Sequence, residues 1–543
     1  AVEKYANEIP ETLPEYLIKE KVLLPLNQTI TGIHFPRDYN ELDKAKFRLK
    51  YEELFYFETL VALRKYSYKN KQKGISFTVK PEPLKKFLNS LPFNLTKAQL
   101  KVLGEIRKDL ESSLPMNRLL QGDVGSGKTI VALISMLIVI ENGYQAALMA
   151  PTEILADQHF KNISRLVERF GIKVCSLIGG QKKKEREENL EAIKNGSAQI
   201  IIGTHALIEG NVVFNKIGLV VIDEQHRFGV MQRSSLIQKG YQPDVLVMTA
   251  TPIPRTLSLT LYGDLDVSVI DEMPADRKPI KTVLRGENKL PDVYKFIIDK
   301  TAEGYQTFLV YPLVEESEKL ELKAAESYYK ELKENHLKDL RIGLIHGRMK
   351  WQEKEQIMFE FADKKYDVLV STTVIEVGID IPDANIIVIN DAFRFGLSQL
   401  HQLRGRVGRS NKQAYCVLIT EDKLAIKINR FNFNFEYLSP SQIETNKAAI
   451  RLNAMLKHSS GFDLAEVDMK LRGPGDIFGT KQSGLPELKY SDIVEDAEIL
   501  YDAKENAFKV ITDDPQLTQN KNFIIKKTLQ EYFHHNIFLS HIA

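Results

Sequence analysis

Three short stretches of this sequence carry residues suited to phosphate chemistry. The first, GDVGSGKT, fits the pattern G-x-x-x-x-G-K-[ST]. Glycines let backbone N–H groups curl around phosphate oxygens, Lys128 can reach the β- and γ-phosphates, and the hydroxyl of Thr129 is a ligand for Mg²⁺. The stretch predicts an ATP-binding loop made of Gly122, Asp123, Val124, Gly125, Ser126, Gly127, Lys128 and Thr129.

The second stretch, VVIDEQH, places two carboxylates at the end of a predicted buried strand. Asp223 would hold Mg²⁺, usually through water, and Glu224 is placed to activate the attacking water. An Asp-Glu pair at a strand end can equally be structural or cap a helix. Its order and distance behind a phosphate loop favour catalysis, with ATP and Mg²⁺ as the expected cofactors.

A third stretch, QLRGRVGR, runs from Gln402 to Arg409 and spaces three arginines with glycines. A positive group at the γ-phosphate accelerates phosphoryl transfer by about 10³–10⁵ where it has been measured. The same spacing would also suit a surface patch for any anion. We expect this stretch to complete the phosphate site.

Two series of short apolar runs must position these three stretches. The first series is AALMAP, VCSLIG, QIIIGT, GLVVIDE and VLVMTA, and the second is TFLVYPLV, RIGLIHG, DVLVSTT, NIIVIND and AYCVLIT. Charged helical segments separate the runs. Alternation of this kind predicts parallel sheets with helices on both faces, so the expected fold class is α/β with two domains in tandem.

The composition of the chain limits the kinds of site and partner that it can have but identifies no reaction. Lys and Arg (74) nearly cancel Asp and Glu (72), so any nucleic-acid surface must be a local patch. The two cysteines lie in different halves of the chain, which argues against a disulfide framework or a zinc site. The apolar run from Ile130 to Ile140 is too short to span a bilayer and predicts a buried helix. The first residues lack the pattern of a signal peptide, so we expect a cytoplasmic protein and no membrane partner.

Together the motifs resemble those of superfamily-two helicases and translocases, from Phe93 onward. FNLTKAQ resembles the adenine-reading motif, with Gln99 as its glutamine, TATPIPR the third motif and STTVIEVGIDIP the fifth. The resemblance implies two RecA-like motor domains that close on ATP. Arg406 and Arg409 would be the γ-phosphate arginines, with Arg409 as the finger. It also adds three residues to the nucleotide-binding set: Gly378, Asp380 and Gln402.

The same resemblance implies a set of residues that track nucleic acid. Four threonines would grip phosphates of the DNA, and two further residues would couple the ATP site to that track. A threonine at a strand end is often only a helix cap, so the two readings compete. The threonines are Thr152, Thr204, Thr372 and Thr373, and the coupling residues are His226 and Thr249.

Three further stretches, DEQHRFGV, LIHGRM and LRGPGDIFGTKQSG, are similar to the RecG family of bacterial branched-DNA translocases. Alone, the Gly-Pro-Gly of the last stretch would mark a surface turn. In that family it is a translocation motif beside a helical pair, expected here near 441–458, with Arg472 and Gln482 at its key positions. The resemblance implies branched duplex DNA as partner (forks and Holliday junctions), a single-stranded DNA-binding protein as a candidate partner, a monomer, and a nucleoid-associated protein of the bacterial cytoplasm.

The expected organisation has four parts. Residues 1–92 form a linker region with a long helix at about 40–68, 93–275 the first motor domain, 276–425 the second, and 426–543 an α-rich translocation region. We expect the family's wedge domain to lie outside this chain. Rival interpretations are the motor of a transcription–repair coupling factor, an RNA helicase and an inactive nucleic-acid-binding scaffold. The intact Lys128, Asp223, Glu224 and Arg409 argue against the scaffold.

Overall fold

The computed structural model describes residues 2–70, 74–224, 230–250, 265–274, 278–312, 327–347, 349–371, 381–410, 412–430, 438–472, 488–492 and 496–532. The chain divides into two compact units. The larger comprises Gly74–Ile253 and Ser268–Leu471, and the smaller comprises Ala1–Lys73, Pro254–Val267 and Arg472–Ala543. Each unit is described by itself below.

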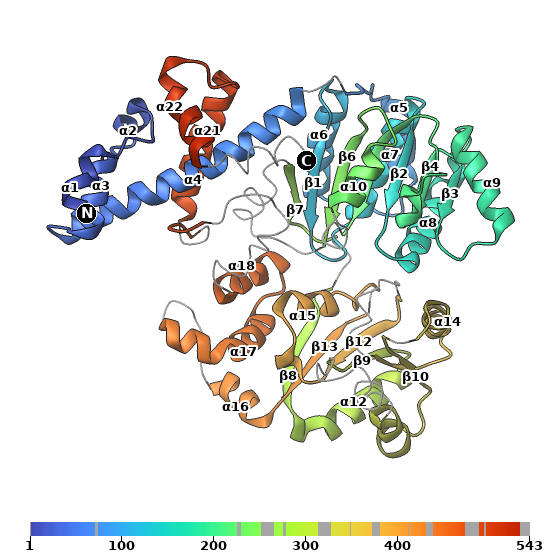
Figure 1. The fold of residues 1–543 in the computed structure, drawn as a ribbon. Helices are drawn as coiled ribbons and strands as arrows, with labels where there is room; N and C mark the ends of the chain where they lie inside the picture. The colour runs from blue at the N-terminus through green and yellow to red at the C-terminus, as the bar shows by residue number, and fades with distance from the viewer. Residues whose placement is uncertain are drawn as a thin grey trace. The chain divides into compact units, whose positions relative to one another are not determined.

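The first sheet has seven strands within the described residues, in the order β3-β4-β2-β5-β6-β1-β7 (Figure 1). All pairings from β3 to β1 are parallel. Consecutive strands on the same sheet therefore need crossover helices, as the alternating pattern predicts. The strands are β1 (Asn117–Gly122), β2 (Gln145–Met149), β3 (Val174–Leu177), β4 (Ile200–Gly203), β5 (Ile217–Asp223), β6 (Asp244–Thr249) and β7 (Asp266–Ile270).

Helix α7 (Lys128–Glu141) is the centre of the first core. Every residue from Ile130 to Ile140 is buried, and the helix packs on β1, β2 and β5. A helix that is apolar all round must lie in the interior, so the expected buried helix is confirmed. The other helices of this part are α5 (Pro81–Ser90), α6 (Lys97–Glu111), α8 (Glu153–Val167), α9 (Lys183–Lys194) and α10 (Val230–Ile237).

The second sheet has six strands in the described residues, in the order β10-β11-β9-β12-β13-β8, and all its pairings are parallel. The expected α/β class with two parallel sheets is thus confirmed. The strands are β8 (Lys281–Gly286), β9 (Gln306–Val310), β10 (Ile342–Ile345), β11 (Val368–Ser371), β12 (Ala384–Ile389) and β13 (Tyr415–Thr420). The helices are α12 (Leu290–Ala302), α14 (Trp351–Ala362), α15 (Leu397–Arg404) and α16 (Asp422–Arg430).

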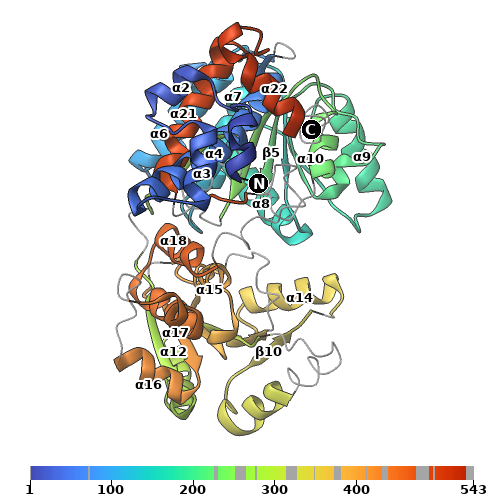
Figure 2. The same ribbon diagram turned by 60° about the vertical axis from the view of Figure 1, so that its left-hand side comes forward.

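A helical hairpin, α17 (Pro440–Lys457) and α18 (Gly461–Arg472), follows the second sheet. Figure 2 shows α16, α17 and α18 gathered beside that sheet, and α17 packs on α15, α16 and β8. The helical pair expected near 441–458 is wrong in extent, because that range is one helix. The turn comes later, where His458 adopts an extended backbone and α18 begins at Gly461.

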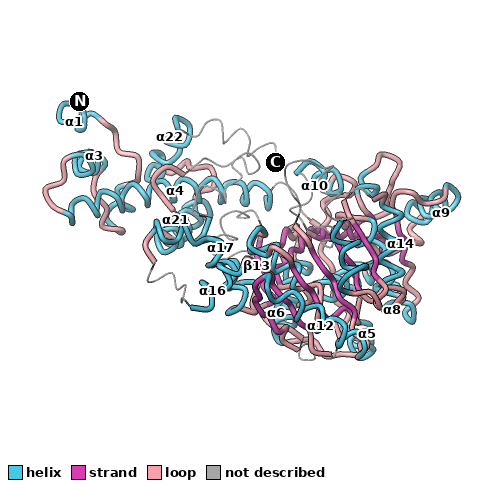
Figure 3. Tube along the Cα trace, turned by 90° about the horizontal axis from the view of Figure 1, so that it is seen from below, coloured by secondary structure: helices cyan, strands magenta, loops and turns pink. Residues whose placement is uncertain are grey.

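The smaller unit is organised by one long helix, α4 (Tyr39–Asn70), which confirms the helix predicted at about 40–68. Figure 3 shows it with α3 (Leu26–His34) and α21 (Ala497–Asp513) alongside. The fully buried Arg48 on α4 lies 2.5 Å from Glu11 and also pairs with Glu52. Three shorter α-helices, α1 (Val2–Tyr5), α2 (Glu15–Glu20) and α22 (Phe523–Tyr532), also belong to this unit. Among the described helices of the chain, none has both the length and the apolar character needed to cross a membrane.

Candidate active site

The predicted phosphate loop lies between β1 and α7. Gly125 and Gly127 have φ of 80° and 85°, in the left-handed region that favours glycine. A Cβ at Gly127 would also lie 2.3 Å from Nε2 of Gln99. The backbone conformation favours glycine here, and the absence of a side chain leaves room for Gln99.

Lys128 is the first residue of α7 and is buried. Its Nζ donates to the carbonyl oxygens of Gly122 at 2.8 Å and Asp123 at 2.9 Å. Burial lowers the pKa of Lys128, while the carboxylates of Glu224 and Asp223 act in the opposite direction. The ammonium group thus stands at the centre of the loop, on acceptors that phosphate oxygens can replace.

Gln99, on α6, contacts the phosphate loop. Its Oε1 accepts from the backbone N–H of Thr96 at 2.8 Å, which completes a capping box. Its Nε2 donates to the carbonyl oxygen of Ser126 at 2.8 Å. The structure therefore joins Gln99 to the phosphate loop, and its contact with adenine stays a prediction.

Asp223 ends β5, and its Oδ2 lies 2.9 Å from Nε2 of His159 on α8. Burial is the largest single influence and would raise the pKa of Asp223, but the hydrogen bond and charge of His159, the charge of Lys128 and a backbone hydrogen bond together lower it. Next to it, Glu224 has a φ of 52° and accepts from the N–H of Ala250 at 3.3 Å. Burial, reinforced by Asp223, raises the pKa of Glu224 to about 7. Two neighbouring carboxylates with separated pKa values suit a metal ligand and a general base.

Arg406 and Arg409, which follow α15, act electrostatically on Glu224 and Lys128, respectively. Among the smaller influences on the two pKa values, Arg406 lowers that of Glu224 and Arg409 lowers that of Lys128. Gly405 approaches the loop so closely that a Cβ there would lie 2.8 Å from Cβ of Val124. The structure brings the three predicted stretches together at one place.

Comparison with known proteins identifies three matching family models. Residues 96–260 match the DEAD/DEAH box helicase family, 288–411 the helicase conserved C-terminal domain, and 458–543 the C-terminal part of domain 3 of ATP-dependent DNA helicase RecG. The ATP-dependent DNA helicase RecG of Streptococcus pneumoniae is 47% identical over 92% of this chain and 71% of its own length. The chain belongs to the RecG family.

Other RecG relatives are longer than this chain. The Synechocystis RecG is 45% identical over 96% of this chain but only 60% of its own length, so the chain spans less than two thirds of that relative. A structure of RecG bound to a three-way DNA junction is 42% identical and superposes with a TM-score of 0.70, covering 92% of this chain and 63% of that one. The family membership confirms the resemblance on which the motif assignments rest.

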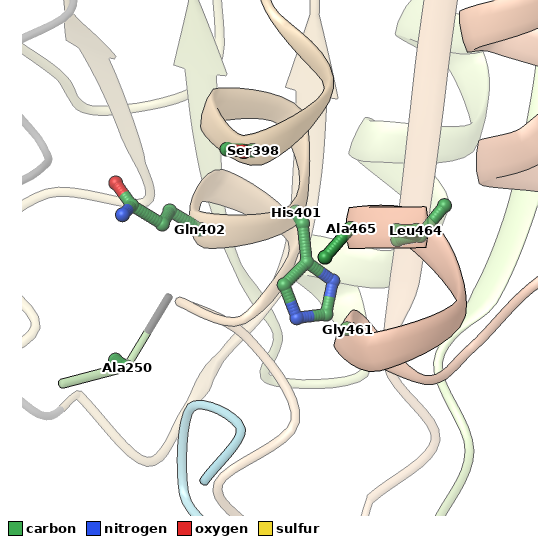
Figure 4. A pocket seen from close by; sticks show the side chains of 7 residues that line it. All are labelled: Ala250, Ser398, His401, Gln402, Gly461, Leu464 and Ala465. Atoms are coloured by element: carbon green, nitrogen blue, oxygen red, sulfur yellow. The ribbon is translucent and has the colours of Figure 1, made fainter. Parts of the chain in front are cut away.

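The other predicted site residues, assigned to DNA contacts, to coupling or to nucleotide binding, lie in varied settings. Thr152 caps α8, and its hydroxyl accepts from the N–H of Leu155 at 3.4 Å. Thr204 directly follows β4, and Thr249 is the last residue of β6. Both are buried. Gln402 lies on α15 beside His401 and lines a small pocket with Ala250 (Figure 4). Outside the described residues lie His226, Thr372, Thr373, Gly378, Asp380, Gln482 and the side chain of Arg472.

The sequence did not indicate His159 and His401, which the structure places at the candidate site, and it did not indicate the contacts of Arg404, one of the three arginines of the 402–409 stretch. His159 had a usable signal, because it falls at helical spacing between the buried Ala156 and Ile163 on α8. The contact of His401 with Asp123 and those of Arg404 with the carbonyl groups near the end of α17 had none, since these partners are distant in the sequence.

Proposed function

We propose that this chain is the motor of an ATP-dependent DNA translocase and helicase that remodels branched DNA in recombination and repair, by fork reversal and branch migration of Holliday junctions. One observation carries the proposal: Arg406 and Arg409, from the second sheet's domain, stand within electrostatic reach of Glu224 and Lys128 in the first. An ATP site shared by two domains can convert hydrolysis into domain movement.

In this proposal each site residue has one task. Lys128 holds the β- and γ-phosphates, Glu224 accepts the proton of the attacking water, and Arg409 stabilises charge on the γ-phosphate. The hydroxyl of Thr129 and the carboxylate of Asp223 hold Mg²⁺, which prefers few protein ligands and keeps several waters. In the described part of the chain, no cluster of three His, Cys, Asp or Glu side chains offers an alternative metal site. Mg²⁺ held there would supply positive charge to the phosphates.

The proposed substrate is branched duplex DNA, as in the RecG structure bound to a three-way junction. The proposed DNA contacts are those expected from the motifs, with Arg472 and Gln482 in the translocation motif. Function as a monomer, partnership with a single-stranded DNA-binding protein and the boundaries 1–92, 93–275, 276–425 and 426–543 belong to the same proposal.

ATP hydrolysis titrated with different nucleic acids tests this function. We expect model forks and duplex DNA to stimulate hydrolysis and single-stranded RNA to leave it at the basal rate. Binding to forks should weaken steeply with salt, because phosphate contacts release counterions. Equal stimulation by RNA would favour an RNA helicase, and the absence of any turnover would favour the inactive scaffold.

A second measurement addresses the translocation motif. Arg472→Ala should keep fork binding and ATP hydrolysis within about twofold of the parent but lose fork unwinding, because the arginine is proposed to transmit movement to DNA. Lys470→Ala, on the same helix, is the matched control. Unwinding at the parent rate in Arg472→Ala would assign the motif to a surface connection.

A further inference from the structure

The side chain of Asp123, in the phosphate loop, bonds two elements outside the loop. Its Oδ1 lies 2.5 Å from Nε2 of His401 on α15, and its Oδ2 accepts from the backbone N–H of Gly461 at 3.0 Å. Gly461 is the first residue of α18. Figure 4 shows the His401 ring extending from α15 toward the start of α18.

The tautomer of His401 follows from its second partner. Nη2 of Arg404 lies 3.0 Å from Nδ1 of His401, and a guanidinium can only donate hydrogen bonds. Nδ1 is therefore the acceptor, and Nε2 carries the proton that it donates to Asp123. Arg404 is itself buried and donates to the carbonyl oxygen of Met455, in the last turn of α17, and to those of His458 and Ser459, which precede α18.

Asp123 also holds the inside of the loop through its backbone. Its carbonyl oxygen accepts from Nζ of Lys128 at 2.9 Å and from the N–H of Ser126 at 3.1 Å. One residue thus bonds the phosphate-binding lysine with its carbonyl group and the hairpin with its carboxylate. A displacement of α18 that pulls on the carboxylate of Asp123 is therefore passed to the carbonyl oxygen of the same residue, which accepts from Lys128.

We infer that Asp123, with His401 and Gly461 as positioning residues, couples the nucleotide affinity of the loop to the position of the α17–α18 hairpin. While both side-chain bonds are made, Lys128 rests on the loop carbonyls, and phosphate must compete with them. When the hairpin shifts, the loop is released and binds nucleotide more tightly. The inference rests on the proposed function in one respect, that DNA is the ligand that moves the hairpin.

Gly461→Pro removes the N–H that bonds Asp123 and places the pyrrolidine ring against that carboxylate, so the bond cannot form. Proline is favoured at the first position of a helix, where its fixed φ fits and its missing N–H breaks no helical bond. Gly461→Ala keeps the N–H and is the matched control. The dissociation constant of fluorescent ADP is measured for the full chain, with and without a model fork.

In the parent and in Gly461→Ala, we expect the fork to tighten ADP binding by about fivefold or more, a typical size for coupling between sites. In Gly461→Pro, ADP should bind about fivefold more tightly without DNA, and the fork should change its affinity by less than about twofold. Equal ADP affinities of the proline and alanine variants without DNA, or an undiminished effect of the fork, would overturn the inference.

His401→Leu removes the other bond of the Asp123 carboxylate, and His401→Gln, which keeps a hydrogen-bond donor, is its control. This pair tests the inference if the proline variant folds poorly. The leucine should reproduce the tighter ADP binding, and the parent affinity there would count equally against the inference. The measurement without DNA separates this inference from the proposed function. A parent that hydrolyses no ATP on any DNA would contradict the function, while the ADP affinities would still decide on Asp123.

Discussion

Nε2 of His159 and Oδ2 of Asp223 lie 2.9 Å apart, and both side chains are buried. The histidine comes from α8 and the aspartate from the end of β5, so the contact joins two elements of the first core. A hydrogen-bonding partner of this kind fixes the orientation of a carboxylate and lowers its pKa, which favours the ionised form that binds metal.

His159→Ala should therefore weaken ATP hydrolysis through Mg²⁺. Loss of such a partner costs about 10–100-fold in metal affinity or activity. We expect the Mg²⁺ concentration for half-maximal hydrolysis to rise, measured by titrating Mg²⁺ at saturating ATP. His34→Ala, at an exposed position, is the control. An unchanged Mg²⁺ requirement in His159→Ala would assign the histidine to packing alone.

Lys128→Ala should abolish ATP hydrolysis, because the phosphates lose their charged partner in a buried site. Steady-state phosphate release in the presence of a model fork measures this. Lys108→Ala, at an exposed position of α6, should hydrolyse ATP like the parent. Turnover of Lys128→Ala near the parent rate would remove the phosphate-loop assignment.

Arg409→Ala should still bind ATP but hydrolyse it about 10³-fold or more slowly, since the arginine acts on charge that develops in the transition state. Fluorescent-nucleotide binding and single-turnover hydrolysis separate the two effects. Loss of nucleotide binding, with the fold intact by circular dichroism, would point instead to a structural role for this arginine.

The sheets were predictable where the strands are apolar throughout. The three strands that the sequence did not predict have polar sequences for identifiable reasons. β7 and β8 lie at sheet edges, and β8 exposes Lys281 and Arg285. β1 lies inside the sheet, between β6 and the edge strand β7, and its Arg118 is paired with Asp109 and Ser268. Hydrophobic patterning fails for a buried strand whose charge is paired.

The chemistry of the site was predictable because the loop at 122–129 and the Asp223-Glu224 pair are local in sequence. The bond between Asp123 and His401 spans 278 residues and depends on how two domains pack, which no local pattern encodes. The prediction of two consecutive helices was right, but their limits were wrong. Its turn is fixed by Arg404, which donates to carbonyl groups more than 50 residues away.

Asp244 gives a test of the fold that is independent of ATP. It begins β6 and is buried; its Oδ1 accepts from the N–H of Met116 at 2.5 Å, and its Oδ2 has no partner within the described ranges. Burial raises the pKa of Asp244 to about 8 from 3.8. The folded state therefore keeps a proton that the unfolded state releases, and this group's contribution to stability is lost as the pH rises from about 4 to about 8.

Asp244→Asn keeps an acceptor for Met116 and removes the titration. We expect the variant to be more stable than the parent at pH 9, on the order of 1–3 kcal/mol, and the difference to shrink toward pH 5. Urea unfolding followed across this pH range measures it. Asp292→Asn, whose side chain is 73% exposed, should leave the pH dependence as it is. A parent and an Asp244→Asn variant with the same pH dependence would show that Asp244 is ionised in the folded protein.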